Sequence, residues 1–308
     1  MNTARFRVYA AAITPIRVDG TPDLEGLAAH CKHLLATGCD GVAPLGTTGE
    51  AAALPFEYRL RTPEVLAKSD LADEAVLIGV GSPSIGDAIA VGRSAVANGY
   101  SNLLALPPYY TKDPSDDGLY DYYARLVEAI DHDRLRLYLY HIPQVTAVAI
   151  TLELIQRLRN TFGALIVGIK DSSGSFASTK AYAELDAFEV YPSSEALLTE
   201  AIAIGCKGVI SGSTNLSGGL ARQVQDASGP ERKALQEKLS EFRQTIQKFP
   251  LIPAVKQVHA WRTGDDGWLR MLPPLRPLSA NQTASLRAKM DHLGALAPQP
   301  EFSTGEKI

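Results

Sequence analysis

The feature that most constrains the fold is a regular alternation of short apolar runs with longer helix-like stretches along most of the chain. Each run is rich in apolar or β-branched residues, has the length of a strand, and ends in a break rich in Gly, Pro, Ser or Thr. The pattern recurs roughly every 25 to 35 residues. Eight such runs occur, at residues 8–14, 41–44, 75–79, 102–106, 136–141, 166–170, 189–192 and 208–212.

Between the runs lie stretches with apolar residues three and four positions apart, as in amphipathic helices. They cover residues 23–37, 56–66, 85–98, 118–130, 151–160, 175–185 and 196–204. Parallel strands need crossover connections, and eight strand–helix units within about 225 residues are what a (β/α)8 barrel requires. An open doubly wound sheet usually carries a glycine-rich dinucleotide loop after its first strand, and AAITPIRVDG contains none. We therefore predict an α/β fold of the TIM-barrel type.

The pattern changes after residue 227, where no further strand-like run occurs. Three helical stretches follow, at residues 231–249, 253–263 and 280–296, with proline-rich breaks between them. We predict a catalytic barrel over residues 1–227 and a C-terminal helical region over residues 228–308. The polar tail at residues 299–308 is expected to fray.

Composition narrows the class of partner. The chain has 308 residues and a formal net charge of −4, with Lys and Arg scattered along it, so it offers no electrostatic surface for nucleic acid or an anionic membrane. The N-terminus lacks a signal-peptide core, and no apolar run is long enough for a membrane span. Three cysteines, an odd number, favour free thiols in a reducing compartment, and neither they nor the six histidines have metal-ligand spacing. We expect a cytoplasmic protein that binds a small molecule without a metal.

Lys170 is the candidate nucleophile. In a parallel barrel the active site lies at the carboxyl ends of the strands, and Lys170 ends the sixth run, in LIVGIKDSSG. A charged lysine is costly to bury beside an apolar strand, and the neutral amine is the form that attacks a carbonyl to form a Schiff base. The alternative is that the side chain extends to solvent at the barrel mouth or pairs with Asp171.

The loop after the second run, Gly46-Thr47-Thr48-Gly49-Glu50, is a candidate anion site. Its glycines let the backbone approach a ligand, while two hydroxyls and successive N–H groups converge on it. A carboxylate would fit such a loop. The alternative is a plain turn with a helix N-cap, because Thr followed by Glu is common where helices begin.

Tyrosines lie at the end of the fifth run and just after the fourth. Strand alternation puts Tyr138 and Tyr140 on one face, with Tyr140 nearer the mouth, where a phenol could relay protons to a carbinolamine. Packing is the alternative role for aromatic residues in strands. The rigid turn Pro107-Pro108-Tyr109-Tyr110 carries two more phenols, which suit either the site or a subunit contact.

Four motifs in this order and spacing, GTTGE at 46–50, PPYY at 107–110, YHIP at 140–143 and GIKDSSG at 168–174, resemble the dihydrodipicolinate synthase/N-acetylneuraminate lyase family. The resemblance covers the barrel, about residues 8–225, and extends to the helical tail. It implies a class I aldolase-type lyase on a TIM barrel, without a cofactor, that acts on pyruvate or a pyruvate-derived 2-oxo acid together with an aldehyde. It also implies a homo-oligomer, either a dimer or a tetramer.

The resemblance implies a role for each matching residue. Lys170 matches the Schiff-base lysine, and Tyr140 matches the tyrosine that shuttles protons. Thr47 and Thr48, beside Gly46, match the residues that hold the pyruvate carboxylate, and Thr47 belongs to a hydroxyl relay. Tyr110 matches the second tyrosine of this relay, which in dihydrodipicolinate synthases is supplied by the partner subunit. Ile210 matches the position where the family places a backbone carbonyl near the lysine.

Two departures from the family pattern concern the second substrate. Dihydrodipicolinate synthases usually carry an arginine five positions after the tyrosine of YxxP, and here that position is Val145, which cannot replace a guanidinium. N-acetylneuraminate lyases carry a glycine and acidic residues after the seventh strand, where this chain has Ser193, Ser194 and Glu195. Ser193 and Glu195 could bind substrate hydroxyls, or Ser194 and Glu195 could serve as the N-cap and first turn of a helix.

Three hypotheses follow. The first is a Schiff-base aldolase for substrates such as 2-keto-3-deoxy sugar acids or 4-hydroxy-2-oxoglutarate. The second is 4-hydroxy-tetrahydrodipicolinate (dihydrodipicolinate) synthase, which condenses pyruvate with aspartate semialdehyde and would need a basic residue from elsewhere, such as Lys112 or Arg17. The third is a non-catalytic barrel that binds a 2-oxo acid, which would be expected to lose the lysine or the tyrosine first.

Overall fold

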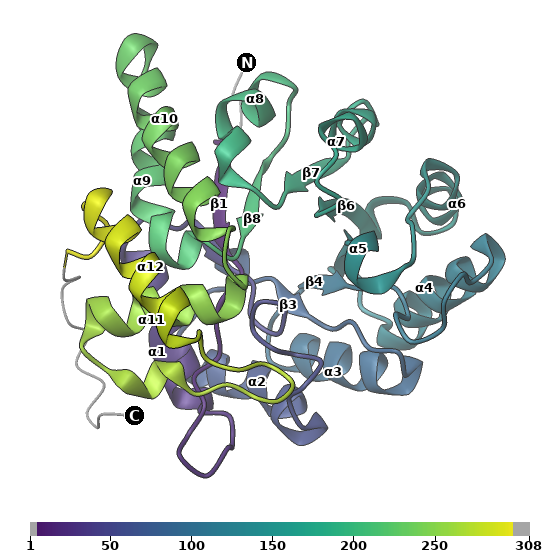
Figure 1. Ribbon diagram of the computed structural model, residues 1–308. Helices are drawn as coiled ribbons and strands as arrows, with labels where there is room; N and C mark the ends of the chain where they lie inside the picture. Colours follow the sequence, from purple (N-terminus) through teal and green to yellow (C-terminus); the bar gives the residue numbers. More distant parts are fainter. Residues whose placement is uncertain (1–4, 298–308) are drawn as a thin grey trace.

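A computed structural model describes residues 5–297 of the protein, and its centre is a ring of eight parallel strands (Figure 1). The strands are β1 (Arg7–Ala10), β2 (Gly41–Val42), β3 (Ile78–Gly79), β4 (Asn102–Ala105), β5 (Arg136–His141), β6 (Ile166–Asp171), β7 (Glu189–Pro192) and β8 (Gly208–Ser211). Each strand lies within or next to a predicted run. The predicted α/β barrel is confirmed.

The barrel closes where two ladders meet. One ladder has the order β2-β1-β8 and the other has the order β3-β4-β5-β6-β7. The Leu77 N–H donates to the Val42 carbonyl at 2.9 Å across one junction, and the Lys207 N–H donates to the Val190 carbonyl at 3.0 Å across the other. Because the barrel is closed, its strand ends form two faces. The face made by the carboxyl ends of the strands is called the barrel mouth.

Helices surround the strands, and polar caps begin most of them. Ser84, Ser115, Thr151 and Ser175 each accept a hydrogen bond from a backbone N–H in the first turn of the helix that follows. The helices are α1 (Leu24–Ala36), α2 (Phe56–Lys68), α3 (Ile85–Ala97), α4 (Asp116–Ile130), α5 (Pro143–Thr146), α6 (Leu152–Phe162), α7 (Phe176–Ala183), α8 (Leu198–Ala203) and α9 (Thr214–Asp226).

Helix α9 was not among the helices predicted from the sequence. Its glycines lower helix propensity, but they allow a close approach to the loop before β2. A Cβ on Gly218 would lie 2.5 Å from the Cys39 sulfur, and one on Gly219 would lie 2.9 Å from the Thr37 carbonyl oxygen. Close packing against residues 37–39 therefore requires these glycines, although they weaken the sequence pattern that indicates a helix.

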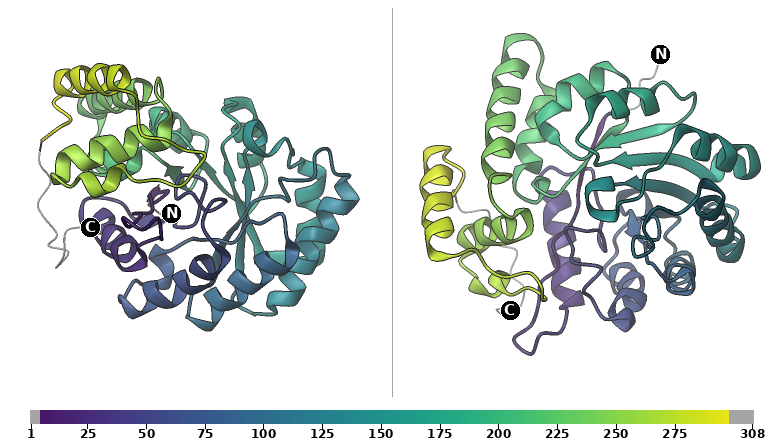
Figure 2. Two further views of the ribbon diagram at one scale, coloured as in Figure 1. Left: turned by 60° about the horizontal axis from the view of Figure 1, so that its bottom comes forward. Right: turned by 45° about the vertical axis from the view of Figure 1, so that its right-hand side comes forward.

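Three further helices, α10 (Gly229–Ile246), α11 (Leu251–Thr263) and α12 (Ala280–His292), gather on one side of the barrel (Figure 2). Their apolar core includes Val258, Trp268 and Met290, together with Ile13 and Leu216 from the barrel. The barrel and the helical region thus share a core. The predicted boundary between residues 227 and 228 remains a prediction, and the predicted fraying of residues 299–308 lies outside the described residues.

Two kinds of feature are absent from residues 5–297. No helix there is long and apolar enough to cross a membrane. Nor does that part of the chain bring together three or more His, Cys, Asp or Glu side chains in a group that could hold a metal ion.

Candidate active site

Lys170 lies at the mouth end of β6, with its side chain inside the barrel. It is 3% exposed, and its Nζ donates a hydrogen bond to the Tyr140 hydroxyl at 3.1 Å. The ammonium also lies 4.1 Å from the centre of the Tyr140 ring. β5 and β6 pair in a register that sets these two residues side by side. The alternative in which the lysine extends to solvent is therefore wrong.

Asp171 does not pair with Lys170, because strand alternation turns it to the outer side of the barrel. Its carboxylate accepts hydrogen bonds from the Thr179 hydroxyl at 2.7 Å and the Ser173 N–H at 2.9 Å. The His141 ring is 3.5 Å away on the same outer side and contacts the Tyr182 hydroxyl. Among residues 5–297, Lys170 makes no salt bridge, so its amine faces a neutral phenol rather than a carboxylate.

The pKa of the Tyr140 phenol is lowered, and the neighbouring groups explain why. Burial alone would raise the pKa of this phenol, but the Lys170 ammonium, the hydrogen bonds from Thr47 and Lys170, and the nearby Ser172 hydroxyl outweigh burial and lower this pKa. The Thr47 hydroxyl donates to the phenol at 3.4 Å. Tyr138, one layer deeper on the same strand face, shows the reverse, because burial and the Glu189 carboxylate raise the pKa of its phenol. Tyr140 is thus placed to give up and recover a proton.

The loop at residues 46–50 forms consecutive turns, and the next helix, α2, begins only at Phe56. The alternative of a helix N-cap at Thr47 or Thr48 is therefore wrong. Gly49 is required sterically, since a Cβ there would lie 2.8 Å from the Ala12 carbonyl oxygen, whereas Gly46 has ordinary space around it. Thr48 is 7% exposed, and Thr47 is half-buried beside Tyr140.

Ser172 is a site residue that sequence reasoning missed. Lys170 and Ser172 are two positions apart, so they lie on the same face and both side chains point into the mouth. Ser172 is buried, and it contributes to the low pKa of Tyr140. The signal was available, because Ser172 follows the candidate lysine by two positions. Ser193 lies nearby, since its N–H donates to the Asp171 carbonyl at 3.0 Å.

Glu195 is placed differently from Ser193. Its side chain is fully buried and accepts hydrogen bonds from the hydroxyls of Ser213 at 2.5 Å and Ser217 at 2.9 Å, and the latter lies on α9. Its backbone carbonyl accepts from Gln236 of α10. Ser194 makes no side-chain cap bond, so the N-cap alternative fails for it, while Glu195 does begin the short 3₁₀ helix Glu195–Leu197. Glu195 thus joins β7 to the outer helices.

Tyr110 is 84% exposed, and within residues 5–297 no hydrogen bond joins it to Thr47. The neighbouring Tyr109 is half-buried, and burial raises the pKa of its phenol. Lys112 fixes this loop against α5 by donating to the backbone carbonyls of Tyr109 at 2.6 Å and Thr146 at 3.3 Å. The loop is therefore held so that Tyr110 projects away from its own barrel.

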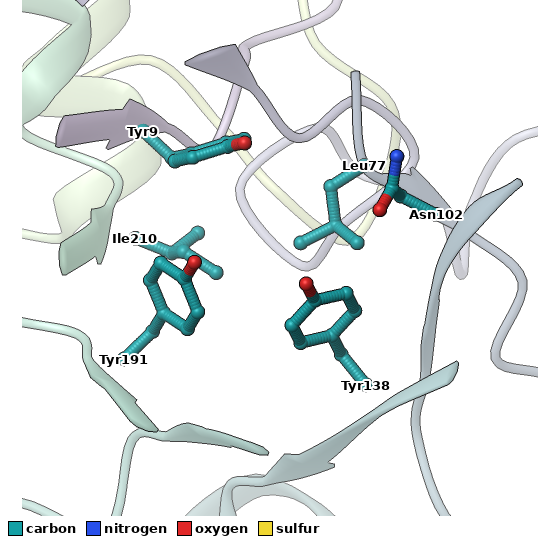
Figure 3. Close-up of a pocket in the computed structure, with 6 residues that line it drawn as sticks. All are labelled: Tyr9, Leu77, Asn102, Tyr138, Tyr191 and Ile210. Atoms are coloured by element: carbon teal, nitrogen blue, oxygen red, sulfur yellow. The ribbon is translucent and has the colours of Figure 1, made fainter. Parts of the chain in front are cut away.

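Beneath the mouth lies a small cavity inside the barrel, about large enough for one water molecule. Figure 3 shows the rings of Tyr9, Tyr138 and Tyr191 around it, with Ile210 behind them. The Ile210 side chain therefore faces the barrel core rather than the mouth. Below the cavity, Glu189 accepts hydrogen bonds from two of these phenols and pairs with Arg7 and Arg136, which closes the floor.

A buried lysine that is hydrogen-bonded to a phenol with a lowered pKa, at the mouth of a (β/α)8 barrel, is the arrangement expected of a class I aldolase-type lyase. The comparisons with known proteins agree. The family model for the dihydrodipicolinate synthetase family matches residues 5–293. The chain belongs to this family and is a Schiff-base-forming lyase.

Individual relatives cover nearly the whole chain. An uncharacterized DapA-like lyase of Chloroflexus aurantiacus is 34% identical over 94% of this chain and 97% of its own length. A crystal structure of dihydrodipicolinate synthase from Agrobacterium tumefaciens has a TM-score of 0.83 at 30% identity, and covers 94% of this chain and 99% of that one. The crystal structure of KD(P)GA from T. tenax has a TM-score of 0.81 at 26% identity, with 94% and 99% coverage.

Proposed function

We propose that Lys170 forms a Schiff base with the keto carbon of pyruvate, or of a pyruvate-derived 2-oxo acid, and that the enamine then makes or breaks the bond between C3 and C4. One observation carries this proposal. Lys170 is 3% exposed, its nearest polar partner is the Tyr140 phenol at 3.1 Å, and within residues 5–297 no carboxylate pairs with it. The amine is therefore not engaged by a carboxylate and can be offered to a carbonyl carbon.

The neighbouring groups supply the protons for each step. The Lys170 amine attacks C2, and the Tyr140 phenol protonates the departing hydroxyl, so that the carbinolamine loses water and becomes an iminium. The iminium withdraws electrons, so that loss of a C3 proton gives the enamine. Alternatively the C3–C4 bond breaks, the C4 hydroxyl passes its proton to the Tyr140 phenolate, and the enamine and an aldehyde form. Tyr140 must both donate and accept, and Thr47 at 3.4 Å connects it to the hydroxyl relay.

Thr47, Thr48 and the backbone at Gly46 would bind the pyruvate carboxylate. The loop combines hydroxyls with backbone N–H groups, which together stabilise an anion without a cationic side chain. Ile210 contributes its backbone carbonyl near the lysine in this proposal, because its side chain is in the barrel core.

The second substrate is proposed to be an aldehyde without a carboxylate, as released from a 2-keto-3-deoxy sugar acid or from a related pyruvate aldol. Val145 occupies the position of the missing arginine and is 57% exposed, so the mouth offers hydroxyls such as Ser172 and Ser193 instead of a guanidinium. The KD(P)GA relative supports this choice. Glu195 binds no substrate in this proposal.

The alternative is 4-hydroxy-tetrahydrodipicolinate synthase, the activity named for several relatives. Their sequence identity to this chain, for example 33%, is close to the 34% of the DapA-like lyase. It requires a cation for the carboxylate of aspartate semialdehyde. The two basic residues considered for that role are engaged elsewhere. Lys112 bonds two backbone carbonyls, and Arg17 pairs with Asp23 at 2.8 Å and Glu25 at 2.9 Å.

We further propose that the enzyme is cytoplasmic and works as a homo-oligomer, a dimer within a tetramer, without a cofactor. Tyr110 at 84% exposure and Val145 at 57% lie on adjacent, mutually anchored loops, which suits a contact between two copies. In such a dimer Tyr110 of each copy would complete the relay at Thr47 of the other.

A product assay distinguishes the two activities. Pyruvate release from 2-keto-3-deoxygluconate and 4-hydroxy-2-oxoglutarate is compared with condensation of pyruvate and aspartate semialdehyde, using wild type and Lys170→Ala. We expect release from at least one sugar acid or hydroxy acid, with loss of that activity in Lys170→Ala. Condensation with aspartate semialdehyde as the faster reaction would establish the alternative, and activity that survives Lys170→Ala would overturn the Schiff-base assignment.

A further inference from the structure

A second fully buried lysine lies outside the mouth, between the barrel and the helical region. Lys256 of α11 and Glu50 form an ion pair in which both side chains are 0% exposed. The Lys256 Nζ also donates to the Arg270 carbonyl at 2.9 Å, and the second Glu50 oxygen accepts from the Leu272 N–H at 2.8 Å. Both carboxylate oxygens of Glu50 thus accept a hydrogen bond, and the Lys256 Nζ donates two.

Glu50 is the last residue of the loop proposed to bind the pyruvate carboxylate. Its backbone has φ of 60°, a left-handed conformation that is unfavourable for a residue with a side chain. Such a conformation persists only where the surrounding structure enforces it. The buried ion pair supplies that restraint, since the Glu50 side chain is held by both Lys256 and Leu272.

A short chain of contacts leads from the ion pair to the nucleophile. The Glu50 N–H donates to the Thr47 carbonyl at 3.1 Å, the Thr47 hydroxyl donates to Tyr140 at 3.4 Å, and Tyr140 accepts from Lys170 at 3.1 Å. The opposite side of the loop is held by the Thr14 hydroxyl, which donates to the Gly49 carbonyl at 2.8 Å. The loop is therefore fixed at both its barrel side and its helical-region side.

We propose that Lys256 is a positioning residue for this loop. Through Glu50 it holds residues 46–50 in the shape that presents Thr47 and Thr48 to the substrate carboxylate. The helical region is then part of the active-site support, and this inference rests on the proposed function. A purely structural role, in which the ion pair only attaches α11 to the barrel, is the alternative to be tested.

The structure offers a matched control for that alternative. Arg262, also on α11, donates to the Leu216 carbonyl of α9 at 2.6 Å and to the Ala295 carbonyl at 2.8 Å. It attaches the same helix to its neighbours without contacting the loop. Arg262→Met therefore weakens the attachment of α11 and leaves Glu50 in place.

The experiment measures the pyruvate concentration that gives half-maximal borohydride trapping, by intact-protein mass spectrometry, in wild type, Lys256→Met, Glu50→Gln and Arg262→Met. Hydroxyacetone, a ketone without a carboxylate, is trapped in parallel. We expect Lys256→Met to raise the half-saturating pyruvate concentration about tenfold or more, while the value for hydroxyacetone changes less than about threefold. Arg262→Met should change neither value, although it lowers the melting temperature.

Unchanged pyruvate binding in Lys256→Met, or equal changes for pyruvate and hydroxyacetone, would overturn the inference. If Lys256→Met does not fold, Glu50→Gln decides by the same two values, because it keeps the shape of the side chain and removes its charge. Absence of any adduct on the wild-type protein would instead remove the proposed function, and the inference with it.

Discussion

Two buried lysines in two regions of the molecule have opposite surroundings. Lys256, between the barrel and the helical region, is 0% exposed and paired with the Glu50 carboxylate and a backbone carbonyl. Lys170, at the barrel mouth, is 3% exposed, and its hydrogen-bond partner is the Tyr140 phenol. Burial alone therefore does not make a lysine a nucleophile. What distinguishes the two is the partner, because a carboxylate holds the Lys256 side chain in an ion pair, whereas Lys170 contacts a phenol at the end of the barrel where substrate enters.

The two regions also differ in what a mutation should do. At the mouth, the groups around Lys170 are expected to control the rate with little effect on folding. Between the barrel and the helical region, the groups around Lys256 are expected to control the free energy of unfolding and, through the loop at residues 46–50, the binding of pyruvate. Four predictions test this division, from the largest expected effect to the smallest.

Replacing Tyr140 by Phe removes the proton relay beside Lys170. We expect the turnover number to fall about 10²–10⁴-fold, the range for loss of a general acid–base group. Because the pKa of Tyr140 is lowered, the wild-type rate should fall as the pH rises through a value below 10, and this alkaline limb should be absent in the variant. Tyr138→Phe, on the same strand face but one layer deeper, is the control and should change the rate only several-fold.

Ser172→Asp would give Lys170 the carboxylate neighbour that Lys256 already has. A carboxylate there would form an ion pair with the Lys170 amine and hold it away from the substrate carbonyl, so we expect trapping and turnover at neutral pH to fall about tenfold or more. Ser172→Asn has the same shape without the charge. Equal loss in the Asn variant would show that shape, not charge, is responsible.

Methionine substitution of each lysine should separate the two roles by stability. Lys256→Met leaves Glu50 charged and buried without a partner, which costs about 3–5 kcal/mol and lowers the melting temperature by roughly 5–15 °C. Lys170→Met leaves no carboxylate unpaired, so it should be neutral or stabilising. Calorimetry on both variants makes the comparison, and equal destabilisation would contradict it.

Lowering the pH is expected to reduce the free energy of unfolding by protonating His30, which lies on the side of the barrel next to the helical region. His30 is buried and hydrogen-bonded to the Asn215 side chain at 2.9 Å. Burial lowers the pKa of His30 from its usual 6.5 to about 4. The unfolded chain then binds more protons than the folded one, so stability present above pH 6.5 is lost as the pH falls towards 4, by about 3 kcal/mol. His30→Gln should remove that part of the pH dependence in urea titrations, and an unchanged slope would refute it.

Strand ends and the residues next to them were predictable from the sequence. The runs at 136–141 and 189–192 coincide with β5 and β7, because their apolar residues are bounded by clear breaks. Lys170 and Tyr140 could then be placed at one end of a barrel from alternation alone, and the structure puts them 3.1 Å apart. Local pattern was sufficient there because a strand fixes the direction of each side chain.

Residues whose roles depend on distant partners were not predictable. Lys256 lies in a helix between polar and apolar residues, and only its packing against Glu50, 206 positions away, shows why it is buried. Glu195 follows β7 like a site residue, but the turn directs it towards Ser213 and Ser217. Helix α9 was missed because its glycines serve packing against residues 37–39.

The most direct measurement is borohydride reduction in the presence of pyruvate, followed by peptide mass analysis that locates the adduct. Both buried lysines are present in one sample, so each is a control for the other. A single pyruvyl adduct on Lys170, with Lys256 unmodified, is the result that this account predicts. An adduct on Lys256, or none on the native protein, would contradict it.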